Sequence, residues 1–189
     1  ALAGMKHLNR LEQVLARAEW DDPGIAEGVM LDTEDRLVCG TMSNLYLLSG
    51  SDLLTPSLAR CGVKGVMRKQ VQKAAATLGL QWQESDLRME DALNADEMYF
   101  SNALIGLWPV RELDEHRYTS MDGGKRLIAA LATGGVRQCD RSCNSCWYLV
   151  SRREGGVFRY LPHYPGGHQC WSGRQPGKSQ RCFASWRGC

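Results

Sequence analysis

Apolar residues change their spacing several times between residues 28 and 132, from short strand-like runs to helical periodicity and back. Short apolar runs separated by polar turns predict strands at 28–31, 37–40, 45–48 and 53–54. From Gly65 the apolar residues take helical spacing, and Gly79 is placed to end the helix. This mixed order indicates an α/β or α+β domain.

The rest of the chain continues the mixed pattern. Leu11, Val14, Leu15 and Ala18 predict an amphipathic helix over 9–20 that starts just after Lys6. A strand is predicted near 80–82 and a short helix at 89–94. Strands at 98–101 and 105–111 flank an interruption at 102–103, and a last helix covers 123–132.

Composition changes near residue 138. Residues 139–189 hold six of the eight cysteines, and eight Lys or Arg against two acids. We therefore predict a folded domain over 1–134 and a Cys/Arg/Gly-rich tail over 135–189 that is disordered or non-native. A zinc site is the less favoured interpretation of the tail, and its ligands would come from Cys139, Cys143, Cys146, Cys170 and His163 or His168.

Several functional classes are disfavoured. No apolar run approaches the roughly 18 residues of a membrane span, and no signal peptide is visible, so we expect no membrane association and a cytoplasmic location. In that compartment disulfides are not expected. A nucleic-acid-binding module would rest only on the charge and aromatic residues of the tail, so we expect no nucleic-acid partner.

Three features carry candidate chemistry. Lys6 lies at an element boundary, where burial or nearby charge would make its amine a nucleophile for an aldehyde. Gly65 opens a helix whose backbone N–H groups at Val66 and Met67 would bind a phosphate monoester; a plain glycine turn is the alternative. Asn102, beside Ala103, would either hydrogen-bond a phosphate oxygen or cap a turn.

These features occur together, in the order found in the fold-type IV pyridoxal-phosphate enzymes. The chain resembles the aminodeoxychorismate lyases in particular, from residue 1 to about 130. The matching segments are 4–15 (GMKHLNRLEQVL), 31–34 (LDTE), 40–47 (GTMSNLYL), 61–68 (CGVKGVMR) and 101–111 (SNALIGLWPVR).

The resemblance implies pyridoxal 5'-phosphate as the cofactor and Lys6 as the residue that forms the internal aldimine and then carries the proton. It implies phosphate ligands at Val66 and Met67 and near Asn102 and Ala103. The implied reaction converts 4-amino-4-deoxychorismate to 4-aminobenzoate and pyruvate, a step toward folate, in a homodimer. Branched-chain and D-amino-acid aminotransferases of the same fold are the alternative.

Two departures from the family pattern favour a third possibility, a non-catalytic degenerate fragment. Cys39 stands where the resemblance places a glutamate that pairs with the pyridine nitrogen, and a thiol with a reference pKa of about 8.5 is a poor substitute. The chain also begins five residues before its lysine, without the smaller N-terminal domain of the family, so it looks like a C-terminal fragment.

Overall fold

The computed structural model describes residues 2–19, 21, 27–113 and 115–136, and the backbone of 148–153 and 157–162. The helices are α1 (Leu11–Arg17), α2 (Val66–Thr77), α3 (Met89–Asn94) and α4 (Asp122–Thr133). The strands are β1 (Gly28–Leu31), β2 (Leu37–Gly40), β3 (Asn44–Ser49), β4 (Asp52–Pro56), β5 (Gln81–Ser85), β6 (Glu97–Asn102), β7 (Gly106–Leu113), β8 (His116–Arg117), β9 (Tyr148–Arg153) and β10 (Val157–Pro162).

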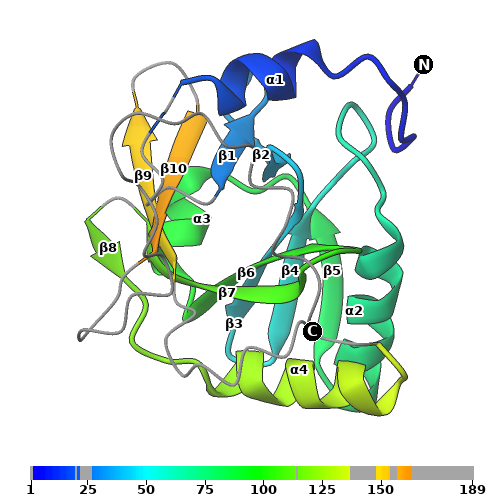
Figure 1. Ribbon diagram of the computed structural model, residues 1–189. Helices are drawn as coiled ribbons and strands as arrows, with labels where there is room; N and C mark the ends of the chain where they lie inside the picture. The colour runs from blue at the N-terminus through cyan, green and yellow to red at the C-terminus, as the bar shows by residue number, and fades with distance from the viewer. Residues whose placement is uncertain are drawn as a thin grey trace, which may run out of the picture.

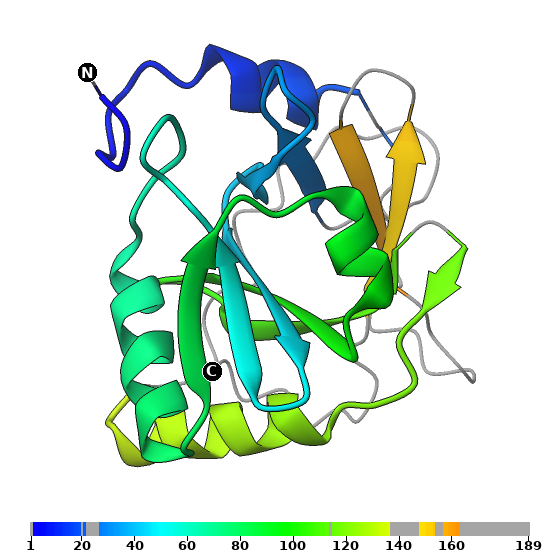
Figure 2. The ribbon, with the colours of Figure 1, turned by 180° about the vertical axis from the view of Figure 1, so that it is seen from behind.

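Within these residues the strands form one mixed sheet. Its order is β2-β1-β10-β9-β7-β6-β3-β4-β5, with β8 paired to β7. Most neighbours are antiparallel, but β7 and β9 are parallel, as are β4 and β5, which α2 connects. Figure 1 shows α2 and α4 together on one side of the sheet. In Figure 2, which views the molecule from behind, β3, β4 and β5 lie side by side in that order. The mixed α/β fold is therefore confirmed.

The alternating side chains of β3 divide the core between the two faces of the sheet. Tyr46 and Leu48 belong to the cluster that α2 and α4 cover, which includes Val71 of α2 and Leu127 of α4. Leu45 and Leu47 belong to the cluster on the other face. The strand predicted from local pattern is thus buried on both sides, as expected of a central strand.

The start of α4 is fixed by Glu97, the first residue of β6. Its carboxylate is 3% exposed and accepts hydrogen bonds from the N–H groups of Gly123 and Gly124, at 2.9 and 3.0 Å. The Tyr99 hydroxyl and the Ser120 hydroxyl also donate to it, each at 2.7 Å. A carboxylate at a helix N-terminus is favourable both as an acceptor and as a charge.

Predicted and observed elements differ at the first helix, at Asn102 and in the tail. The first helix is shorter than predicted, and Leu11, Val14 and Leu15 are 59–67% exposed, so its expected buried face is wrong; Ala16 is its buried residue. Asn102 belongs to the end of β6 rather than to the interruption.

In the tail, which we predicted to be disordered or non-native, β9 and β10 are strands between β7 and β1. The pattern had indicated no regular element there. The candidate zinc ligands lie outside the described residues, and the boundary at residue 134 stays a prediction.

Candidate functional site

The predicted phosphate-binding turn is the beginning of α2. Gly65 is the N-cap, with φ −67° and ψ 153°, and no side chain caps the helix. The N–H groups of Val66 and Met67 have no acceptor within the helix because they belong to its first turn. Val66 is 69% exposed, whereas Met67 packs into the core. The helix start therefore offers donors and a partial positive charge to an anion.

Asn44, which sequence reasoning did not single out, fixes the path of this turn. Its side-chain N–H donates to the Val63 carbonyl at 2.7 Å, and its carboxamide oxygen accepts the Gly65 N–H at 3.2 Å. A Cβ on Gly65 would lie 2.5 Å from that oxygen, so only glycine fits. Asn44 is 6% exposed and begins β3, so the sheet itself holds the start of the helix.

Arg68, in the first turn of α2, binds the helix start to β4 and β5. Its guanidinium donates to the Thr55 hydroxyl at 2.9 Å and to the Pro56 carbonyl at 3.0 Å, and it pairs with Glu84 at 3.1 Å. It also lies over the Trp82 ring, 5.6 Å from the centroid. Arg68 is 4% exposed, and its charge is directed toward β4 and β5.

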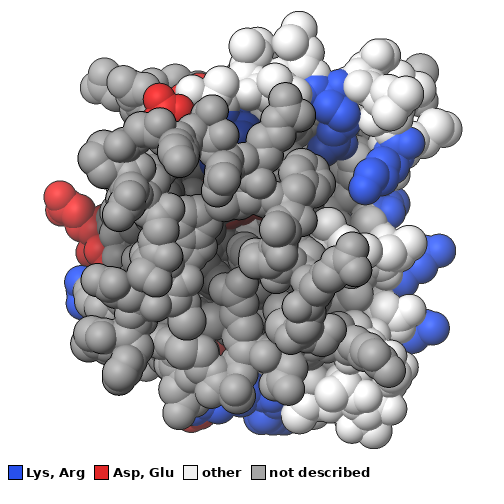
Figure 3. Space-filling view, viewed as in Figure 1, with Lys and Arg blue, Asp and Glu red and all other residues white. Residues whose placement is uncertain are grey.

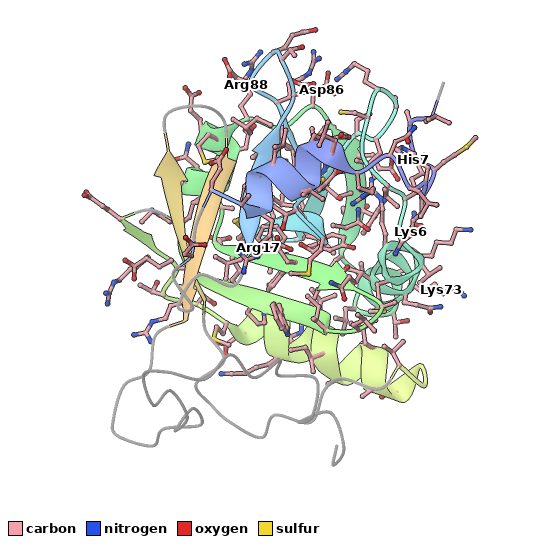
Figure 4. The ribbon with its side chains drawn as sticks, turned by 45° about the horizontal axis from the view of Figure 1, so that its top comes forward. Lys6, His7, Arg17, Lys73, Asp86 and Arg88 are labelled. Carbon is pink, nitrogen blue, oxygen red and sulfur yellow. The ribbon has the colours of Figure 1, made fainter. Side chains whose placement is uncertain are left out.

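The Lys6 segment lies against the same turn. Gly4 forms a parallel bridge with Val63: the Gly4 N–H donates to the Gly62 carbonyl at 2.9 Å, and the Lys64 N–H donates to the Gly4 carbonyl at 3.0 Å. Figure 4 shows Lys6 and His7 beside α2, on the side of Lys73. The structure thus brings the candidate anchor to the candidate phosphate turn.

Lys6 itself is exposed, however. Of the two features that would activate its amine, burial or nearby charge, burial is therefore not seen, and the place of Lys6 beside the turn is what favours the anchor role. Lys6, Lys64, Lys69 and Lys73 are all exposed residues of the two segments. In Figure 3, Lys and Arg side chains gather along the side where α2 and the N-terminal segment lie in Figure 1. A positive edge of this kind attracts a phosphate.

Asn102 closes the next turn at the end of β6. Its carboxamide oxygen accepts the N–H groups of Leu104 and Ile105, at 2.8 and 2.9 Å, so it caps the turn. One of its side-chain N–H groups reaches the Met42 carbonyl at 3.3 Å. Ser101, the preceding residue, is opposite Asn44 in the β3–β6 register, which places this turn next to the α2 start. Ala103 is exposed in the same turn.

Cys39 lies in β2, within a small apolar cluster with Val38 and Leu58. It is 7% exposed. Burial, with a smaller contribution from the nearby Glu27 carboxyl, raises the pKa of its thiol to about 12. The thiol is therefore neutral at physiological pH and supplies no negative charge.

Glu27, just before β1, is a second residue that sequence reasoning missed. It is 1% exposed, and burial raises the pKa of its carboxyl, while hydrogen bonds from Thr41 and Ser43 oppose the rise. A charged residue directly before an apolar strand was the available signal. Its partners, 14 to 16 residues away, could not be read from local pattern.

Two features are absent from the described part of the chain. None of its helices is long and apolar enough to cross a membrane. Nor do its His, Cys, Asp and Glu side chains form a group of three or more suited to a metal ion.

Comparison with known proteins gives a consistent result. The profile of the family described as "Amino-transferase class IV" matches residues 1–113. Aminodeoxychorismate lyase of Vibrio harveyi is 41% identical over 109 residues, which are 58% of this chain and 40% of that protein. A putative branched-chain-amino-acid aminotransferase of Methanocaldococcus jannaschii is 32% identical over 110 residues, 58% of this chain and 38% of that protein.

Among solved structures, 4-amino-4-deoxychorismate lyase from Pseudomonas aeruginosa is similar, with a TM-score of 0.67 and 48% identity. The match covers 70% of this chain and 49% of that chain. The chain thus spans half or less of the length of these relatives.

Proposed function

The chain belongs to the class IV aminotransferase family, whose aminodeoxychorismate lyases and aminotransferases use pyridoxal phosphate, and from that premise we propose that it carries the cofactor-anchoring part of an aminodeoxychorismate lyase. The reaction would convert 4-amino-4-deoxychorismate to 4-aminobenzoate and pyruvate, toward folate. By the same proposal the working protein is a cytoplasmic homodimer. The identities of 41% and 48% to the lyases of Vibrio harveyi and Pseudomonas aeruginosa, against 32% to the aminotransferase of Methanocaldococcus jannaschii, support this choice.

One observation carries the proposal: the Lys6 segment is hydrogen-bonded to the turn that opens α2. A cofactor with an aldehyde at one end and a phosphate at the other needs an amine and an anion site close together. The N–H groups of Val66 and Met67 would hold the phosphate, together with the second side-chain N–H of Asn102. Lys6 would hold the cofactor covalently and move the substrate proton.

The residues fit the phosphate end of the cofactor better than the ring end. At the phosphate end, Gly65 lets the turn pass close to Asn44, whose carboxamide oxygen accepts the Gly65 N–H, so the sheet fixes the start of α2. At the ring end, the neutral Cys39 thiol cannot keep a pyridine nitrogen protonated. When bound, pyridoxal phosphate supplies an electron-withdrawing ring, and this chain would leave that ring less activated than a carboxylate would.

A non-catalytic cofactor-binding protein is the second candidate. The neutral Cys39 and the exposed Lys6 favour it, because neither provides the charge or the desolvation that catalysis needs. The chain would then bind the cofactor without turnover.

The test is a titration with pyridoxal phosphate, followed by the visible absorbance that the cofactor acquires on reaction with a lysine. Borohydride trapping and peptide mass spectrometry then identify the modified residue. We expect modification of Lys6 and its loss in Lys6→Ala, with Lys125→Ala, an exposed lysine of α4 outside the candidate site, as the matched control. Equal colour in wild type and Lys6→Ala would refute the anchor.

Turnover separates the candidates. Release of 4-aminobenzoate from 4-amino-4-deoxychorismate identifies the lyase, and keto-acid-dependent amino transfer identifies the aminotransferase. Cofactor attachment to Lys6 without either product identifies the non-catalytic protein.

A further inference from the structure

The carboxyl group of Glu27 is fully engaged by one short turn. One oxygen accepts the N–H groups of Gly28, at 3.1 Å, and Thr41, at 2.9 Å, and also the Thr41 hydroxyl. The other accepts the Met42 N–H at 3.3 Å and the Ser43 hydroxyl at 2.7 Å. All five donors are uncharged, and four of them belong to residues 41–43.

The turn closes tightly around this carboxyl. A Cβ on Gly40 would lie 2.9 Å from the Glu27 carboxyl carbon and 2.3 Å from the Ser43 hydroxyl oxygen. The Gly40 N–H donates to the Ser43 carbonyl at 2.8 Å, and the Thr41 N–H also donates to the Gly28 carbonyl at 3.0 Å. Glu27 therefore acts as the centre around which residues 40–43 are folded.

This turn touches both elements that we propose as phosphate ligands. The Met42 carbonyl accepts the Asn102 side-chain N–H at 3.3 Å. Directly after the turn, Asn44 holds Val63 and Gly65 at the start of α2. A shift of residues 41–43 would therefore move Asn102 through its hydrogen bond to Met42. It would also move Asn44, the next residue along the chain, and with it the start of α2.

We propose that Glu27 is a positioning residue of the cofactor site: its buried carboxyl sets the 40–44 turn, and through it the orientation of Asn102 and the α2 start. The inference rests on the proposed function for the identity of the ligand. Glu27 would contact neither cofactor nor substrate.

Glu27→Gln tests the inference because it keeps the shape and replaces one acceptor oxygen with a donor NH₂. The new NH₂ group replaces one of the two oxygens. It then faces either the Met42 and Ser43 donors or the Gly28 and Thr41 donors, and in both cases donor meets donor. Thr41→Val, which removes a single hydroxyl donor, is a milder second variant that keeps the test available if Glu27→Gln does not fold.

Glu97→Gln is the matched control. Glu97 is also buried and accepts from two hydroxyl and two backbone groups, one backbone group fewer than Glu27, but it lies at the opposite end of β6 from Asn102. Five residues of extended strand separate the two positions by about 17 Å. Its substitution should weaken the fold without altering the cofactor site.

Two measurements test whether Glu27 positions the cofactor site. Hydrogen exchange of the full chain without cofactor should show faster exchange at 40–44 and 102–105 in Glu27→Gln but not in Glu97→Gln. The dissociation constant of pyridoxal phosphate should rise about tenfold, as expected from losing one or two hydrogen bonds, while the Glu97→Gln value stays at that of wild type.

The outcomes are distinct. Unchanged exchange at 40–44, or faster exchange with an unchanged dissociation constant, overturns the positioning role. An equal loss of affinity in Glu97→Gln also overturns it, because the effect would then follow stability alone. Failure of wild type to show any Lys6-dependent cofactor binding is a failure of the proposed function instead.

Discussion

The side-chain oxygen of Asn44 accepts the backbone N–H of Gly65 at 3.2 Å, so the first residue of β3 holds the N-cap of α2. A helix start of this kind is placed by the sheet and not by a capping side chain of its own. The consequences can be measured at both residues.

Asn44→Ala should lower the free energy of unfolding by about 1–3 kcal/mol, because it leaves the Val63 carbonyl and the Gly65 N–H without this partner. Urea denaturation measures the change, and phosphate affinity should fall with it. Asn94→Ala, at an exposed position at the end of α3, is the control and should change neither quantity. Equal effects of the two substitutions would contradict the role of Asn44.

Gly65→Ala should cost about 1–3 kcal/mol, because the added Cβ would lie 2.5 Å from the Asn44 oxygen. Gly134→Ala is a suitable comparison: it also lacks a positive φ, and its Cβ would be 3.4 Å from the nearest atom. Thermal unfolding of both variants is the measurement. A Gly65→Ala protein as stable as Gly134→Ala would show that the turn can move away.

The Cys39 thiol should give the protein a stability that declines at alkaline pH. Its folded-state pKa is about 12, raised by burial, whereas an unfolded thiol ionises at about 8.5. Above about pH 8.5 the unfolded chain therefore releases a proton that the folded chain keeps, and the free energy of unfolding falls by about 1.4 kcal/mol per pH unit.

Cys39→Ala isolates this contribution, since every other titrating group is retained. Between about pH 8.5 and pH 10 the wild type should lose stability more steeply than the variant in chemical denaturation. Parallel pH profiles would show that the thiol titrates normally. As a second measurement, iodoacetamide should modify Cys39 more slowly than the half-buried Cys61.

Cys39→Glu should raise enzymatic activity and tighten cofactor binding, because a carboxylate can pair with the pyridine nitrogen. Without cofactor the same substitution should be destabilising by several kcal/mol, since position 39 is 7% exposed and lies in an apolar cluster. Pyridoxal phosphate should restore more stability to Cys39→Glu than to Cys39→Gln. A Cys39→Glu protein no more active than its parent would count against the idea that the thiol limits catalysis.

The local sequence pattern predicted most of the helices and strands whose formation depends on residues close together in the chain. The helix from Val66 to Thr77 follows from apolar spacing, and Gly79, at φ +72°, ends it as predicted. The strands β1 to β4 follow from short apolar runs between polar turns. The same kind of evidence located Gly65 at a helix start and gave turn capping as one of two roles for Asn102, which caps the turn after β6.

Long-range contacts were beyond that pattern. Asn44 and Glu27 act on residues 14 to 21 positions away, and although Glu27 directly precedes an apolar strand, local pattern cannot identify such distant partners. The exposure of the apolar residues of α1 was also missed, because periodicity shows that a face is apolar and not what covers it. For the same reason the tail composition gave no sign of β9 and β10.

The tie between Asn44 and Gly65 also bears on how this protein acquires its anion site. A peptide comprising α2 alone would contain the proposed backbone donors at Val66 and Met67 but not Asn44, the residue that sets their direction, because β3, β4 and their loops separate Asn44 from the helix in sequence. The site is thus a product of folding and is absent from the unfolded chain. A ligand that binds it would shift the folding equilibrium toward the native state, and cofactor supply would then regulate how much folded protein a cell maintains.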